Sequence, residues 1–377
     1  MSSEASAEQS FGGAHPAGLR TLFFTEMWER FSYYGMRALL VLFMVQAVED
    51  GGMGLDDRTA TAIFGLYAAA VYLANLPGGW IADRLLGAQR SIWYGGIVIM
   101  LGHFTLAIPG TVTFFLGLLF VVLGTGLLKP NISAVVGDLY APDDPRRDSG
   151  FTIFYMGINL GAAIGPLVCS ALGESETFGW HYGFAAAGVG MLAGLIQFRL
   201  GRHRLGSAGL RPSLDASQPA ERARIVSGWR RVGIGLTLLA AIVALLLTGA
   251  VSLDAVAISR GSTIAIGLLA AAYFTWLLAF AGLTGDEKKR VVVIMVLFLG
   301  AAMFWAGFEQ AGSSLNLFAE RYTQRQFGDF EIPAGWFQTL NPMFIIVLAP
   351  VYSAAWVALA RRNLNPSTPA KFGLGLV

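Results

Sequence analysis

The 377-residue chain has 55% hydrophobic residues and only 13% charged residues, whereas a soluble domain has about 25% charged residues. The net charge of +2 indicates no class of partner by itself. The apolar residues fall in long runs, so the composition argues against a soluble domain and predicts an all-α polytopic membrane protein. The single cysteine, Cys169, lies in an apolar run and excludes an intrachain disulfide; we expect it to pack in a core.

The chain begins with a polar tail, residues 1–19, that no short cleavable apolar core follows, so we expect a cytosolic tail rather than a signal peptide. A bilayer core needs about 20 apolar residues per helix. About ten segments meet this length, and four of them are long enough to tilt or bend: 20–48, 59–84, 91–110, 112–139, 149–172, 180–199, 229–250, 262–283, 291–320 and 335–360.

Polar loops divide the chain into parts. After the tail we expect a six-helix N-terminal bundle (20–200), a basic cytosolic linker (201–228), an extra transmembrane helix pair (229–285) and a partial C-terminal bundle (286–377) with helices 7 and 8 and the start of a ninth. Because the chain stops at "STPAKFGLGLV", where another apolar run begins, the expectation is a truncated chain with an incomplete C-terminal half.

The basic residues of the loops indicate how the chain is oriented in the membrane. Eight arginines lie from Arg199 to Arg231 alone, and the loops on the same side are also rich in Lys and Arg, whereas the loops on the other side hold few. Since basic loops stay on the cytoplasmic side, we expect a multi-pass protein of a bacterial inner membrane with a cytoplasmic N-terminus.

The first helix carries a row of polar residues at spacings of 3, 1, 3, 1 and 3, which places them on one stripe: Glu26, Glu29, Arg30, Tyr33, Tyr34 and Arg37. Each central charge costs about 2.5–3.5 kcal/mol to insert. We therefore expect Glu26 to pair with Arg30, Glu29 to reach Arg30 or Arg37, and the stripe to face a hydrated cavity. The alternative is that these pairs only hold helices together, although buried ion pairs stabilise weakly.

The stretch "EMWERFSYYGMR" resembles the ExxERFxYYG signature of the proton-dependent oligopeptide transporters, a branch of the major facilitator superfamily. Further stretches resemble the same family across nearly the whole chain: "GGWIADRLLGAQR", "GLLKPN", "FYMGINLGAAIGP", "FWAGFEQAGSSLN" and "LNPMF". The extra helix pair is typical of bacterial members. The resemblance fails at the C-terminus, where the family has four further helices, one usually carrying a glutamate for the peptide's amino terminus.

The resemblance implies a major facilitator fold and a monomeric, proton-coupled symporter that imports di- and tripeptides by alternating access. One alternative is a transporter of nitrate or of peptide-like drugs on the same scaffold. Another is a truncated, non-transporting membrane scaffold. No nucleotide-binding motif, metal cluster or nucleophile–base pair is recognisable, so we expect no enzyme, no cofactor, no metal and no nucleic-acid partner; the partners are peptides, protons and membrane lipid.

Two charges lie deep in other helices. Lys129 has no acidic neighbour at helical spacing, and Glu309 lies in the opposite half of the chain. A Lys129–Glu309 pair would bridge the halves and act as a gate that protonation of Glu309 releases, and the resemblance implies the same pair. The alternative is that each residue pairs locally.

Other polar residues complete the predicted site. Arg37 and Lys129 are expected to bind the peptide carboxylate. Asn159 and Asn341 either hold helices together by hydrogen bonds or, as the resemblance implies, contact the peptide. Four aromatic residues are expected to line the cavity rather than face lipid: Tyr33, Tyr34, Tyr72 and Trp305. The proton-coupling candidates are Glu26, Glu29, Arg30, Lys129 and Glu309.

Three further predictions concern structure rather than substrate. Asp83, Arg84 and Arg90 resemble a superfamily loop motif that latches one conformation through charge pairs and helix ends. His103 is expected to be a packed polar residue rather than a proton relay. The glycines of "GINLGAAIG", at positions 157, 161 and 165, are expected to allow close helix packing.

Overall fold

The computed structural model describes residues 14–210, 218–249, 253–364 and 366–376. The long helices are α2 (Ala17–Val45), α3 (Asp57–Ile81), α4 (Ala88–Leu106), α5 (Thr111–Asp138), α6 (Arg147–Gly173), α7 (Trp180–Gly201), α8 (Pro219–Leu247), α9 (Ala255–Phe280), α10 (Gly285–Phe308) and α12 (Leu340–Arg361). Two shorter helices are α11 (Ser314–Tyr322) and α13 (Thr368–Leu376). A small antiparallel hairpin, β1 (Gln326–Phe327) and β2 (Phe330–Glu331), follows α11.

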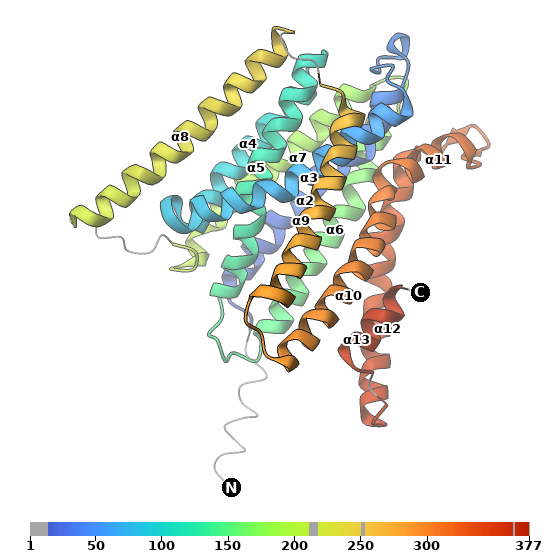
Figure 1. Ribbon diagram of the computed structural model, residues 1–377. Coiled ribbons are helices and arrows are strands. Elements are labelled where there is room, and N and C mark those ends of the chain that lie inside the picture. The colour runs from blue at the N-terminus through green and yellow to red at the C-terminus, as the bar shows by residue number, and fades with distance from the viewer. Residues whose placement is uncertain (1–13, 211–217, 250–252, 365, 377) are drawn as a thin grey trace.

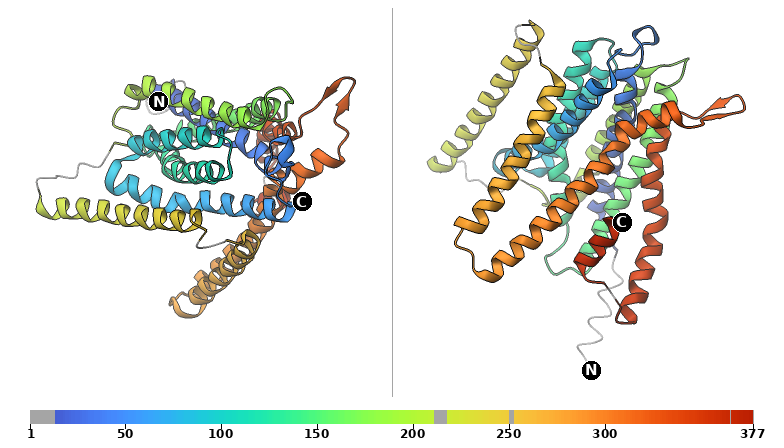
Figure 2. Two further views of the ribbon diagram at one scale, coloured as in Figure 1. Left: turned by 90° about the horizontal axis from the view of Figure 1, so that it is seen from above. Right: turned by 45° about the vertical axis from the view of Figure 1, so that its right-hand side comes forward.

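Helices α2 to α7 form one bundle, with α2 in its interior (Figure 1; Figure 2, left). Most of α2 from Leu19 to Met44 is buried, its charged residues included. The start of α2 lies beside the end of α7, because the Thr21 hydroxyl donates to the Gly201 carbonyl over 3.2 Å. We call this end of the bundle the N-side and the opposite end, where α2 and α6 finish, the far side.

Glycines set the distance between α2 and α6. A Cβ atom at Gly161 would collide with the carbonyl oxygen of Met27, and one at Gly165 would collide with that of Phe31. At Gly157 a Cβ would lie 3.0 Å from the Phe23 carbonyl oxygen. The predicted close packing along this glycine row is therefore present, and it brings the α6 backbone directly against the charged stripe of α2. Cys169 packs in the same contact and is fully buried, as expected.

The helix pair α8–α9 lies outside the bundle. Helix α9 packs along α3, whereas α8 contacts the bundle chiefly through Gly228 against Leu85 (Figure 1). Helix α8 begins at Pro219, so the last part of the linker predicted over 201–228 is helical instead. Proline is favoured in the first helical turn, and Glu221 follows in the same turn, where a carboxylate interacts well with the helix N-terminus.

The predicted segment 291–320 is interrupted. A 3-10 turn, η4 (Glu309–Gly312), ends α10, and α11 continues from Ser314. The predicted segment 335–360 starts with another 3-10 stretch, η5 (Ala334–Thr339), which leads into α12. Both irregular stretches lie where the C-terminal part of the chain meets α2 and α6. They place polar side chains and backbone groups at that boundary.

Eight helical segments of the described chain are long and apolar enough to cross a membrane, and α2 and α4 are not among them. Helix α2 has the length but carries five charged side chains, which explains why hydropathy alone misses it. Within the described residues the only strands are the two-residue strands β1 and β2, and all other regular structure is helical, so the predicted all-α, polytopic membrane fold is confirmed.

Candidate functional site

A cluster of three charged side chains lies inside the bundle on α2. The Arg30 guanidinium contacts Glu26 over 2.9 Å and Glu29 over 2.5 Å, and all three residues are at most 4% exposed. The predicted Glu26–Arg30 pair and the reach of Glu29 to Arg30 are confirmed. The stripe turns into the protein, since its side chains pack among buried residues rather than on the bundle surface. Two carboxylates around one guanidinium leave the cluster one negative charge in excess.

Glu309 pairs with a different cation from the one predicted. Its Oε2 lies 2.8 Å from Arg37 Nη2, and Arg37 also donates to the Glu309 backbone carbonyl over 3.4 Å. In the described part of the chain Lys129 forms no ion pair, so the predicted Lys129–Glu309 bridge is wrong for this conformation. The reason is geometric: Glu309 begins the η4 turn, and this turn packs directly against Arg37 on α2.

Arg37 lies beside two aromatic rings and packs against Gly312. Its guanidinium lies 5.7 Å from the Tyr34 ring centroid and 5.5 Å from that of Phe64, which suits cation–π attraction. Gly312 packs directly against it, because a Cβ there would lie 2.6 Å from Arg37 Nε. Just beyond, the Asn316 side chain donates to the Ala38 carbonyl over 2.8 Å. The first helix and the region after α10 therefore meet around a single buried arginine.

Lys129 contacts an aromatic ring instead of a carboxylate. Its ammonium nitrogen lies 4.5 Å from the centroid of Tyr72, which is 48% exposed. A cation over a ring face is stabilised by the ring quadrupole, but less than by a carboxylate, so the ammonium keeps capacity for an anion. The prediction that Tyr72 lies beside the charged residues is supported by this contact.

Several buried polar atoms in this region have no hydrogen-bond partner among the described residues. They are Glu26 Oε2, Glu29 Oε1, Arg30 Nη2 and the Tyr67 hydroxyl. Tyr67 stacks on Tyr33, with 6.5 Å between ring centroids, and Tyr33 in turn lies 5.4 Å from the Arg30 guanidinium. Unsatisfied buried polar atoms are rare in native proteins and indicate a place for water, protons or a polar ligand.

The other predicted site residues differ in how deeply they are buried. Asn159 is buried, and its side chain donates to the Tyr155 carbonyl one turn earlier, a bond within α6 rather than to another helix. Asn341 is exposed on α12, contrary to the predicted buried amide, because few described segments pack against α12 apart from α6 and η5. Trp305 is 48% exposed on α10 and contacts Phe304 and Phe308.

The predicted latch shows no charge pairing. Asp83 and Arg84 lie in a π-helical turn, η2 (Ala82–Leu86), and both are exposed, as is Arg90 at the start of α4. Within the described residues none of the three forms an ion pair, and Arg90 lines a recess with Arg199 and Arg202 instead. Gly87 (φ 79°), a left-handed position that favours glycine, separates η2 from α4 and therefore Asp83 and Arg84 from Arg90. His103 is fully buried in α4, in keeping with its predicted packing role.

The sequence analysis missed two contacts that join the C-terminal part of the chain to the bundle on the far side. Arg321 on α11 forms a bidentate ion pair with Asp57 at the start of α3, with N–O distances of 2.6 and 2.9 Å. Glu174, after α6, accepts hydrogen bonds from the backbone of Ala334 and Gly335. Neither carries a local spacing signal, since each partner is distant in sequence.

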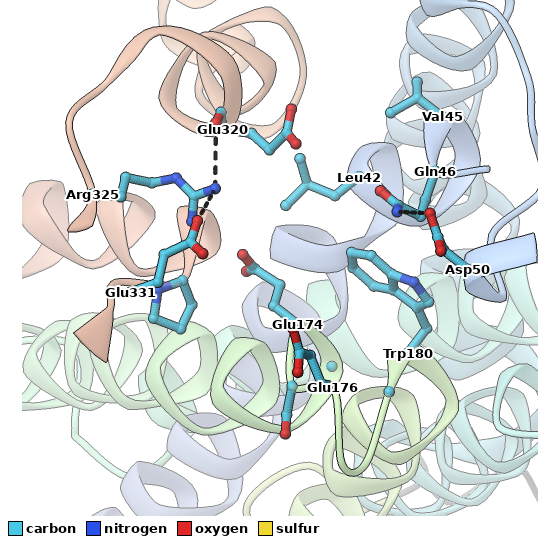
Figure 3. Close-up of a pocket in the computed structure, with 14 residues that line it drawn as sticks. Leu42, Val45, Gln46, Asp50, Glu174, Glu176, Trp180, Glu320, Arg325 and Glu331 are labelled. Atoms are coloured by element: carbon cyan, nitrogen blue, oxygen red, sulfur yellow. Dashed lines mark hydrogen bonds and ion pairs between the residues drawn. The ribbon is translucent and has the colours of Figure 1, made fainter. Parts of the chain in front are cut away.

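Between these contacts a cavity of about 660 Å³ opens on the far side, away from the charged cluster (Figure 3). Its charged lining residues come from η1 (Val48–Asp50), the α6–α7 connection, α11 and the hairpin region: Asp50, Glu174, Glu176, Glu320, Glu331 and Arg325. Arg325 contacts Glu331 over 2.8 Å. Five carboxylates facing one guanidinium make this cavity acidic.

The family is decided by comparison with known proteins. The model of a protein family described as the POT family matches residues 89–377. The chain belongs to the POT family. The match starts after the charged first helix, so it does not depend on "EMWERFSYYGMR", the first of the motifs on which the predicted resemblance rests, and that prediction is confirmed.

Individual POT proteins agree with this assignment. The peptide transporter YePEPT of Yersinia enterocolitica is 46% identical over 369 residues, covering 96% of this chain and 71% of that protein. A di-/tripeptide transporter of Lactococcus lactis subsp. cremoris is 41% identical over 381 residues, covering 98% and 74%. A crystal structure of a peptide transporter POT in complex with sulfate matches with a TM-score of 0.83 at 44% identity, covering 96% of this chain and 72% of that one.

Proposed function

We propose that this POT protein imports di- and tripeptides together with protons by alternating access. Its relatives are named for peptide transport, and its fold is that of a POT crystal structure. The observation that carries the coupling proposal is the buried Glu26–Glu29–Arg30 cluster, because carboxylates kept from bulk water with unsatisfied oxygens can take up and release protons. The peptide crosses unchanged, so the protein is a transporter and not an enzyme.

The charges match the ends of a peptide. Lys129, which pairs with no carboxylate among the described residues, is available for the peptide carboxylate, and Asn159 is available for its amino end. Tyr33, Tyr34, Tyr72 and Trp305 would offer rings that accept many peptide side chains. Asn341 would join the site only in a conformation in which its exposed face meets the N-terminal bundle.

The Arg37–Glu309 ion pair would act as a gate that a proton or a peptide can open. A proton on Glu309 weakens its ion pair with Arg37, and a peptide carboxylate competes with Glu309 for the same guanidinium. Either event releases the C-terminal part of the chain from α2. This replaces the predicted Lys129–Glu309 gate with an Arg37–Glu309 gate, while Lys129 keeps the role of a binding cation.

The driving force is adequate for uphill import. A gradient of about one pH unit and about 100 mV supplies about 1.4 plus 2.3 kcal/mol per proton. At one proton per peptide this permits about 500-fold accumulation. A POT protein with several apolar helices is a multi-pass membrane protein; we further propose a bacterial inner membrane, a cytoplasmic N-terminus and a monomer, supported by the basic N-side loops.

Uptake into proteoliposomes tests the proposal. Labelled dialanine is expected to accumulate when the outer solution is acidic and the interior negative, and to equilibrate without concentration when the gradient is collapsed by an uncoupler. Counterflow of dialanine against preloaded dialanine, compared with nitrate, separates peptide from small-anion transport. Absence of uptake and of counterflow with folded protein would support a non-transporting scaffold instead.

A further inference from the structure

A basic recess of about 280 Å³ lies on the N-side of the bundle, between the start of α4 and the end of α7. These two helices pack side by side (Figure 1). Helix α4 contributes Arg90, Trp93 and Tyr94 to the recess, and the end of α7 contributes Arg199 and Arg202. Three of the five lining residues are therefore arginines, and the transport mechanism proposed above uses none of them.

The three arginines concentrate positive charge without a counter-charge from the protein. In the part of the chain that the structure describes, no carboxylate lines the recess and none of the three guanidiniums forms an ion pair. Arg90 and Arg199 are exposed and Arg202 is half-buried, so their donors are accessible to a ligand. Like charges that share one recess repel one another, and an anion bound among them would remove that repulsion.

Two of the lining side chains are fixed by neighbours. Arg202 Nε donates to Gln89 Oε1 over 3.1 Å, and the side-chain nitrogen of Gln89, a buried residue, donates in turn to the Ala208 carbonyl over 2.7 Å. Trp93 stacks on Phe198, with 6.4 Å between the ring centroids. The bond to Gln89 uses Nε and leaves the two Nη groups of Arg202 for a ligand. The recess is therefore partly preorganised.

An exposed apolar strip continues from the recess along the same two helices. On α4, Leu101 follows Tyr94 at helical spacing, and on α7, Leu192 and Ile196 precede Arg199 at helical spacing; the four apolar or aromatic residues are all exposed. In a membrane such side chains contact acyl chains, while Trp and Tyr favour the level of the headgroups. The recess and the strip together match the two parts of a phospholipid.

We propose that the recess binds the headgroup of an anionic phospholipid, with the phosphate among Arg90, Arg199 and Arg202 and the acyl chains along the apolar strip. Guanidiniums bind phosphate oxygens in a bidentate manner, and basic pockets between transmembrane helices bind such headgroups. A zwitterionic headgroup fits less well, because its cation would meet three guanidiniums with no carboxylate to receive it. The recess is smaller than the about 300–1,000 Å³ of pockets for drug-sized ligands, which suits a small headgroup.

Native mass spectrometry of the purified protein in detergent tests this binding. The probes are dioctanoyl phosphatidylglycerol, dioctanoyl phosphatidylcholine and inorganic phosphate. The first phosphatidylglycerol should bind the wild type at least about tenfold more tightly than phosphatidylcholine. A recess variant that combines Arg90→Gln, Arg199→Gln and Arg202→Gln should lose at least about tenfold in affinity for phosphatidylglycerol, since each basic side chain near an anionic lipid contributes about fivefold.

The control variant combines Arg222→Gln, Arg224→Gln and Arg230→Gln, three exposed arginines of α8 on the same side of the protein. It changes the net charge equally and should bind phosphatidylglycerol as the wild type does. Thermal unfolding of the same samples checks that the variants are folded. Without lipid the recess variant should unfold at the wild-type temperature or above it, because the repulsion is gone, and phosphatidylglycerol should raise the midpoint of the wild type and of the control variant only.

Three results would overturn the proposal. The first is equal affinity of the wild type for phosphatidylcholine and phosphatidylglycerol, and the second is equal loss of affinity in the recess and control variants. The third is stabilisation by inorganic phosphate as large as that by phosphatidylglycerol, which would make the recess a site for the free anion.

A photoreactive lipid gives a test that needs no variant. Phosphatidylglycerol with a photoreactive group on an acyl chain should label the wild type on the strip around Leu101 of α4 or Leu192 of α7, and label confined to other helices would contradict the proposal. None of these measurements involves peptide transport, so the lipid site and the proposed function can each fail without the other.

Discussion

Arg37 on α2 and Glu309 at the end of α10 form an ion pair of 2.8 Å across 272 residues of sequence, and the arginine side chain is almost completely buried. This pair ties the first helix to the C-terminal part of the chain. Removing one partner of a buried pair leaves the other charge uncompensated, which costs about 3–5 kcal/mol. The pair is therefore a place where a small chemical change, such as one proton, has a large structural effect.

Glu309→Gln should lower proton-driven dialanine uptake at least about tenfold, because the neutral amide holds Arg37 weakly at every pH. The matched control is Asp57→Asn, which breaks the half-exposed Asp57–Arg321 pair; exposed pairs are worth at most about 1 kcal/mol, so uptake should change less than about fivefold. Equal losses in the two variants, measured as initial rates in proteoliposomes, would mean that Arg37–Glu309 has no special role.

Glu29→Gln and Lys129→Ala should both abolish accumulation of peptide against a gradient. The first removes a carboxylate that we propose carries the proton, and the second removes the cation that we propose binds the peptide carboxylate. Dialanine counterflow, which needs no net proton movement, should survive Glu29→Gln and fail in Lys129→Ala. Accumulation at the wild-type level in both variants would show that the coupling and binding assignments are wrong.

Gly161→Ala should lower the free energy of unfolding by about 1–3 kcal/mol, because its methyl group has no space against the Met27 carbonyl. Gly233→Ala is the control: this glycine lies in α8 with nothing within 4 Å of a Cβ, and alanine should stabilise the helix by up to about 1 kcal/mol. Thermal unfolding in one detergent, followed by tryptophan fluorescence, compares the two. Equal midpoints would contradict the close α2–α6 contact.

Tyr67→Phe should leave stability unchanged or slightly higher, since the buried hydroxyl has no partner among the described residues. If this hydroxyl contacts peptide, affinity should fall by about tenfold, the value of one good hydrogen bond. Tyr94→Phe, half-exposed on α4, is the control. Calorimetric titration with dialanine measures the affinity, and unaltered binding by the Tyr67→Phe protein would show that this hydroxyl does not contact the peptide.

Local patterns predicted much of this structure. The spacing of Glu26, Glu29 and Arg30 determines both their common face and their pairing, because helix geometry fixes which side chains meet within one turn or the next. The glycine row on α6 likewise predicted a close helix contact. The helices themselves follow from apolar runs of membrane length, and α2 was found by its length and polar stripe although its charges lower its hydropathy.

Partners distant in sequence were harder to predict. The Lys129–Glu309 pair is predicted because Lys129 lacks an acidic neighbour at helical spacing and Glu309 is the other deep charge. The choice among cations, however, depends on where η4 ends α10. The contact of Glu174 with Ala334 and Gly335 involves backbone donors, which every residue possesses, so the sequence contains no specific sign of it. The exposed position of Asn341 follows from the packing around α12, a tertiary property.

Proton entry driven by peptide tests the central claim most directly. Liposomes loaded with a pH-sensitive dye, at equal pH inside and outside and with an inside-negative potential, should acidify when dialanine is added to wild-type protein, and should not acidify with Glu29→Gln although that protein still exchanges peptide. Acidification by Glu29→Gln at the wild-type rate, or peptide entry by the wild type without any acidification, would contradict a proton-carrying role for the charged stripe of α2.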